Sequence, residues 1–198
     1  MKYYRYILTV LCVVFLSSCV HLYHKAQPVP ANMAFENYPI ISIDAANIEV
    51  RNDYRMPMFE PNVEHLFPIP LYIAVKGLID NSLLALGDKK ILKVIIDEAS
   101  VVSEPVPIDI SFWGNFKKEP VEILKAKVSL RFELVAEEAP DIILGYANII
   151  SKRNKTLMED MSNAARDRAY YDLTEELLAD INKGMQDVVK KNFSMNGF

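Results

Sequence analysis

Apolar and polar residues alternate along four stretches of the chain, and this alternation predicts four β-strands. The clearest stretch is 123–135, where every second residue from Leu124 to Leu134 is apolar and those between are largely charged or polar. One buried face and one wet face are typical of an antiparallel sheet. The other expected strands are 40–50, with a bulge near Ala45–Ala46, then 91–102 and 142–152.

Two further stretches have the three-to-four-residue spacing of amphipathic helices. The first covers 71–86 and has Gly87 where a C-terminal cap belongs. The second covers 159–192, which is longer than one small sheet should cover, and Thr156 to Glu159 spells a capping box before it. The order is therefore strand, helix, three strands and helix.

This order predicts an α+β fold, in which a four-stranded, mostly antiparallel sheet carries both helices on one face. A short turn at 137–140 should join the last two strands as a hairpin. The length of 198 residues favours a single domain, which we place at 40–198.

The first residues follow a different pattern. Lys2 and Arg5 precede a ten-residue apolar run, Ile7–Leu16, which is too short to span a membrane but has the length of a secretory h-region. The run ends in the sequence Leu-Ser-Ser-Cys at Cys19, which resembles the lipobox of bacterial lipoproteins. The resemblance implies acylation of Cys19 and cleavage before it.

Residues 1–18 would then be a signal peptide, and 19–39, which contains several prolines, a lipidated tether. Cys12 lies in the discarded part, so the mature chain has no internal disulfide. Two or more acyl chains on Cys19 should hold the protein on a membrane. By analogy with lipoprotein sorting in enteric bacteria, Val20 in place of Asp favours the outer membrane over the inner one.

Composition excludes several classes of protein. With 51% apolar and 24% charged residues the chain is neither disordered nor a coiled-coil rod. Its formal net charge of −4 argues against a nucleic-acid binder, which needs a basic surface.

No catalytic or cofactor constellation is visible. His65 is the one histidine after the tether, and it has no nucleophile motif beside it, so a hydrolase site would depend on His65 and a carboxylate. The adjacent Glu64 is expected to be solvated or in a turn contact. Cys19, His21 and His24 do not form a metal site, because an acylated sulfur is no thiolate. We expect no metal and no cofactor.

Two aromatic loops are better candidates for contacts. One, 61–68, contains His65 and Phe67. The other, 105–120, is long for a connection between strands and carries Phe112, Trp113 and Phe116 before two lysines. These aromatics either cover the core or contact a partner or membrane surface.

Two charged features also have alternative interpretations. Asp97 interrupts an apolar strand, so it lies at an edge, lies at a bulge, or pairs with a base such as Arg153 or Lys152. The basic segment 151–155 is expected to be a solvated turn, with lipid phosphate binding as the alternative.

Three runs carry a broader resemblance: PNVEHLFP at 61–68, IIDEASV at 95–101 and SKRNKTLMEDMS at 151–162. With the paired strands and the long helix, they resemble uncharacterised alphaproteobacterial envelope lipoproteins. The architecture is more loosely similar to that of the lipopolysaccharide-assembly lipoprotein and of auxiliary lipoproteins of ABC-type lipid importers.

The sequence thus favours a non-enzymatic envelope lipoprotein that acts as an accessory or assembly subunit with an envelope protein partner. One alternative is a lipoprotein that binds a lipid or amphiphile between helix and sheet, and another is a periplasmic hydrolase. A filled core favours the first, an apolar cavity the second, and His65 bonded to both a serine and a carboxylate the third.

Overall fold

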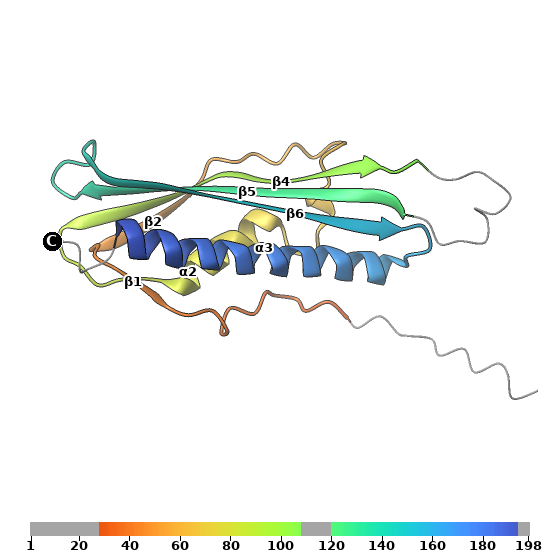
Figure 1. Ribbon diagram of the computed structural model, residues 1–198, viewed down its shortest axis with the longest axis horizontal. Helices are drawn as coiled ribbons and strands as arrows, with labels where there is room; N and C mark the ends of the chain where they lie inside the picture. The colour runs from red at the N-terminus through yellow and green to blue at the C-terminus, as the bar shows by residue number, and fades with distance from the viewer. Residues whose placement is uncertain (1–27, 108–119, 194–198) are drawn as a thin grey trace, which may run out of the picture.

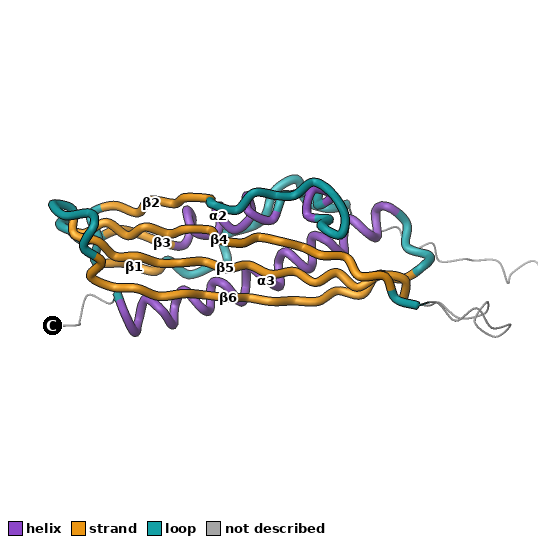
Figure 2. The backbone as a smooth tube through the Cα atoms, turned by 90° about the horizontal axis from the view of Figure 1, so that it is seen from above, coloured by secondary structure: helices purple, strands orange, loops and turns teal. Residues whose placement is uncertain are grey.

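The computed structural model describes residues 28–107 and 120–193, and its main element is one long sheet (Figures 1 and 2). Four strands form this sheet, in the order β2 (Asn47–Asn52), β4 (Lys90–Pro105), β5 (Pro120–Ala136) and β6 (Ile143–Met158). β2 is parallel to β4, and the other two neighbouring pairs are antiparallel.

Two helices, α2 (Leu71–Ser82) and α3 (Asn163–Asn192), lie along one face of the sheet (Figure 1). The predicted α+β class and the mostly antiparallel four-stranded sheet are therefore confirmed. The alternation in β5 sets the orientation of the layers, because Leu124, Leu130 and Phe132 are fully buried beneath the helices. Arg131, between two of them, lies on the opposite, wetter face.

The sheet is long enough to cover the whole of α3. Strands of 16 or 17 residues extend for about 50 Å, and a 30-residue helix for about 45 Å. The expectation that the last helix would outgrow the sheet is wrong, because the strands are longer than their alternation suggested.

The boundary between β6 and α3 also differs from the prediction. β6 continues to Met158, and Thr156 is paired with Ile123 rather than capping a helix. The cap of α3 is Ser162, whose side chain accepts a hydrogen bond from the Ala165 N–H at 3.2 Å. The long partner strand β5 keeps residues 153–158 extended, although their sequence has no strand-like alternation.

The predicted strand 40–50 is two strands in two sheets. β1 (Ile41–Ile43) pairs in parallel with β3 (Leu83–Ala85), and the chain then crosses to β2 in the main sheet. β3 occupies residues that were predicted to complete the first helix, so α2 ends at Ser82 and Gly87 is not its cap.

Part of the expected tether packs onto the domain. Met33 is buried, and Phe35 and Tyr38 pack against the core. Figure 1 shows this first segment of the described chain running along the side of the helix layer that faces away from the sheet. A Cβ on Gly77 would lie 2.7 Å from Cζ of Phe35, so α2 needs a glycine where this ring approaches it. From at least Met33 onward, the segment belongs to the folded unit.

Candidate functional site

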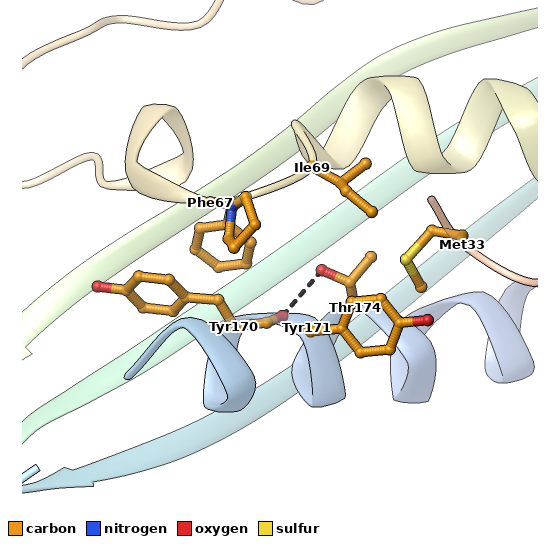
Figure 3. A pocket seen from close by; sticks show the side chains of 7 residues that line it. Met33, Phe67, Ile69, Tyr170, Tyr171 and Thr174 are labelled. Carbon is orange, nitrogen blue, oxygen red and sulfur yellow. Dashed lines mark hydrogen bonds between the residues drawn. The ribbon is translucent and has the colours of Figure 1, made fainter. Parts of the chain in front are cut away.

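The space between α3 and the loop before α2 is filled (Figure 3). Phe67 stacks on Tyr170 with ring centroids 4.5 Å apart, and no space for a water molecule remains among the residues around them. Figure 3 shows Met33, Ile69, Tyr171 and Thr174 completing this contact. Phe67, proposed from the sequence as an exposed contact residue, is 5% exposed and belongs to the core.

His65 does not form a catalytic constellation with the described residues. Its side chain is half-buried, and its Nδ1 atom has no hydrogen-bond partner. No serine or carboxylate in the described ranges bonds to it, so the geometry that would favour a hydrolase is not found there.

The neighbouring Glu64 is buried rather than solvated, which corrects the sequence interpretation. Its carboxylate accepts hydrogen bonds from the Tyr54 hydroxyl, from the Val101 N–H at 3.2 Å and from Nδ2 of Asn62 at 3.5 Å. Burial, reinforced by the bond to Glu64, raises the pKa of Tyr54. This network fastens the loop 53–67 to the edge of β4. Tyr54 and Val101 are 10 and 37 residues from Glu64 in the sequence, so no local pattern reveals these two contacts.

A cavity of about 550 Å³ lies at the end of the sheet. Its walls come from the loop before α2, the end of β4, the start of β5 and the first turn of α3. The apolar wall residues are Pro61, Val63, Leu66, Pro105 and Val121, and the polar ones are Glu60, Ser103, Glu122 and Arg166.

The polar groups of the cavity form a short chain of hydrogen bonds. Arg166 Nη1 donates to Glu122 at 2.8 Å, and the Ser103 hydroxyl donates to the other carboxylate oxygen at 2.5 Å. The neighbouring Tyr170 hydroxyl, and then Glu122, raise the pKa of Arg166, so it is charged at any physiological pH. Sequence reasoning missed this set, because three elements that are distant in the chain supply its members.

Among the strands in residues 28–107 and 120–193, none pairs with the outer edge of β6. Residues 143–150 of this edge carry no charge, and Leu144, Tyr146 and Ile150 point away from the helix layer with about half or more of their side chains exposed. Edge strands commonly carry lysines that discourage pairing with another chain, and here a lysine first occurs at Lys152.

The basic segment 151–155 lies in β6 and not in a solvated turn. Arg153 donates two hydrogen bonds to Asp180 of α3, at 2.6 and 2.7 Å, and Lys155 pairs with Glu176. The Arg153 guanidinium holds the pKa of Asp180 below its usual value. Two of the three basic side chains therefore fasten β6 to α3.

Asp97 lies next to a bulge, between Ile96 and Glu98, and also forms an ion pair. Its partner is Arg131 of β5, which contacts it through two nitrogen atoms at 2.9 and 3.1 Å. Two of the three sequence interpretations thus hold together, but the expected partners Arg153 and Lys152 were wrong. Arg131 is opposite Ile95 in the register, which brings it beside Asp97.

Several predicted residues lie outside the described ranges: Cys19, Phe112, Trp113 and Phe116. Within those ranges, no group of three or more His, Cys, Asp or Glu side chains is placed to hold a metal ion. Among the described helices, none has the length and apolar character needed to span a bilayer.

No known protein-family model matches the chain, and no curated protein matches it. Three similar solved structures are bacterial lipoproteins. A minor lipoprotein from Acinetobacter baumannii has 8% identity and a TM-score of 0.41, and the match covers 80% of this chain and all of that one. Rare lipoprotein B from Shewanella oneidensis has 12% identity and a TM-score of 0.38, and the match covers 73% of this chain and 95% of that one. An uncharacterised lipoprotein B from Nitrosomonas europaea has 10% identity and a TM-score of 0.39, and the match covers 80% of this chain and 93% of that one. Similarity at this level does not assign a function to this chain.

Proposed function

We propose that this protein is a non-enzymatic envelope lipoprotein, anchored through acyl chains on Cys19, that acts as an accessory subunit of an envelope protein. In this proposal residues 1–18 are the signal peptide and the domain faces the periplasm, held at the outer membrane. The lipobox resemblance supports the anchor. The uncharged, unpaired edge of β6 carries the accessory role.

The occupant we propose for this edge is an extended segment of the partner that adds a fifth strand. Along residues 143–150, the main-chain N–H and C=O groups on the side away from β5 pair with no described strand, so they can offer the hydrogen bonds that an added strand needs. Figure 2 shows the C-terminal part of α3 reaching past β6, so an added strand would lie over this helix. The absence of charge along 143–150 fits a partner strand with few charges.

A second contact with the partner or the membrane surface is proposed for four residues: His65, Phe112, Trp113 and Phe116. If Trp113 contacts the partner, Trp113→Ala should weaken recovery of the partner and leave the thermal midpoint unchanged. His65→Ala should complement a deletion strain almost normally. The accessory role would be abandoned for an enzymatic one if His65→Ala, still folded and membrane-bound, failed to complement while Trp113→Ala succeeded.

Site-specific photocrosslinking in intact cells tests the edge. A photoreactive residue in place of Tyr146, at the edge, should capture the partner through one extended segment, identified by mass spectrometry of the crosslinked peptide. The same residue in place of Lys127, on the same face but in the interior strand β5, is the matched control. Equal capture from both positions would show that the partner binds the sheet face and not the edge.

The anchor has its own test. Cys19→Ser should release the protein from membranes or block its processing, whereas Cys12→Ser should leave both unchanged. Incorporation of labelled fatty acid into the Cys19→Ser protein at the normal level would exclude the lipobox.

A further inference from the structure

The cavity at the end of the sheet has the size and composition of a small-molecule site. Its volume of about 550 Å³ is within the range of ligand pockets, which are largely apolar with a few placed polar groups. Val63 and Val121 form part of an apolar wall, and Leu66 contributes a side chain that is about half exposed. This wall suits a hydrocarbon chain.

The charges around the cavity are of both signs. Glu122 is satisfied by Arg166 and Ser103, one to each carboxylate oxygen. A guanidinium has five N–H donors; the contact with Glu122 uses one of them, and the Tyr170 hydroxyl lies close enough to take another. Arg166 therefore retains donors for an anionic group, while Glu60, an exposed wall residue with no ion pair among the described residues, is available for a cation.

The cavity lies at the end of the molecule from which the described chain begins. In Figure 1 the end of β4, the start of β5 and the start of α3 share this end, and the first described segment, in red, begins on the same side of the molecule. The chain from Cys19 to Pro28, with the eight residues 20–27 between them, can extend to about 30 Å at most. With Cys19 acylated, the cavity would stay near the membrane surface.

We propose that the cavity binds a single-chain amphiphile with a zwitterionic phosphate–amine headgroup. Arg166 binds the phosphate, Glu60 binds the ammonium, and the hydrocarbon chain lies against Val63, Leu66 and Val121. This site is separate from the β6 edge, so either proposal can fail without the other.

Photoaffinity labelling tests the headgroup preference. The mature lipoprotein, held in a non-ionic polymer, is exposed to three dodecyl probes with a terminal diazirine: a phosphoethanolamine, a phosphate monoester and an ammonium. The phosphoethanolamine should label peptides containing 61–66 and 121–122 about tenfold more than the other two, the change expected for one charge-assisted hydrogen bond.

Two variants separate the roles of the charges. Arg166→Gln should remove the preference over the alkylammonium, and Glu60→Gln should remove the preference over the alkyl phosphate. Arg168→Gln is the matched control, because Arg168 is on the same helix but pairs with Asp172 and lies over the Tyr171 ring. If Arg166→Gln unfolds because it loses the contact with Glu122, the test of the headgroup preference rests on Glu60→Gln, which changes an exposed residue.

Equal labelling by the three probes would overturn the proposal, as would labelling confined to peptides outside the cavity. Loss of selectivity in Arg168→Gln to the same extent as in Arg166→Gln would also overturn it.

Discussion

The two edges of the main sheet differ in whether another segment of the described chain pairs with the long outer strand. Along β4, the strand β2 pairs with the first half, and the segment 53–63 follows the second half, where the Val63 N–H bonds to the Val101 carbonyl at 2.9 Å and the Ser103 N–H to Pro61 at 2.8 Å. Along β6, no strand of the described part of the chain pairs with the outer side of 143–158. Figure 2 shows both edges, with the covering loop running beside β4.

This difference explains the proline-rich loop. A run with four prolines between 57 and 70 cannot form a regular strand, yet it supplies single hydrogen bonds to the edge and is fixed there by buried Glu64. The β6 edge is not paired with any described strand, and its first half, 143–150, carries no charged residue. An edge that is left open in this way is suited to an exchangeable partner.

The largest effect is expected in the core beneath both edges. Phe132→Ala should lower the free energy of unfolding by about 3–5 kcal/mol, because the side chain is fully buried in the central strand. Arg131→Ala, the adjacent residue on the wet face, should cost less than ~1 kcal/mol. Urea denaturation measures both, and a reversed order would mean that the faces of β5 are assigned the wrong way round.

The covered edge should depend on Glu64. Glu64→Ala leaves the Tyr54 hydroxyl and the Val101 N–H without their acceptor, which should cost about 1–3 kcal/mol. Glu64→Gln keeps one acceptor oxygen and should cost less. Hydrogen exchange at Val101 should quicken in the alanine variant, and unchanged exchange there would show that Glu64 does not hold the loop.

A smaller, pH-dependent effect is expected where β6 is fastened to α3. The folded-state pKa of Asp180 is lowered by Arg153, so its stabilisation is present above the usual carboxyl pKa, near 4, and is lost as the pH falls through the folded value. Because the pair is partly exposed, Asp180→Asn should cost less than ~1 kcal/mol at pH 7. Denaturation curves of the two proteins should converge in acid, and a difference that persisted there would point to packing instead of charge.

The open edge should lose its partner without losing stability. Ile150→Lys places a charge on a residue that is 61% exposed, so the thermal midpoint should stay within about a degree. Crosslinking through Tyr146 should nevertheless fall sharply, because a lysine on an edge strand disfavours pairing. Ile150→Val is the control, and it should crosslink as the native protein does.

These regions show which parts of the strands can be predicted from the local alternation of apolar and polar residues and which cannot. The strict alternation of 123–135 gave β5 its faces, and the burial of Phe132 and exposure of Arg131 could be predicted from it. The same reasoning predicted that the fourth strand ends at 152, because residues 153–158 have no alternation of their own. Their extended conformation depends on pairing with β5.

The candidate sites show the same division. The absence of charge along 143–150 is visible in the sequence, but an edge can be recognised only when the neighbours of a strand are known. Neither Glu64 nor Arg166 was predicted as a site residue. Their environments are assembled from β4, β5, α3 and the loop, and such long-range contacts leave no periodic signal.

Periodicity in the sequence was enough to predict the main layers of this protein: the three long strands and the two helices, the buried face of β5, and the α+β class. These follow from periodicity, which each segment carries within its own residues. Tertiary structure alone decided where β6 and α2 end, that β1 pairs with β3, that Glu64 and Phe67 are buried, and that a cavity forms around Arg166. Each of these depends on free energies shared between segments far apart in the chain, so no single segment can encode them.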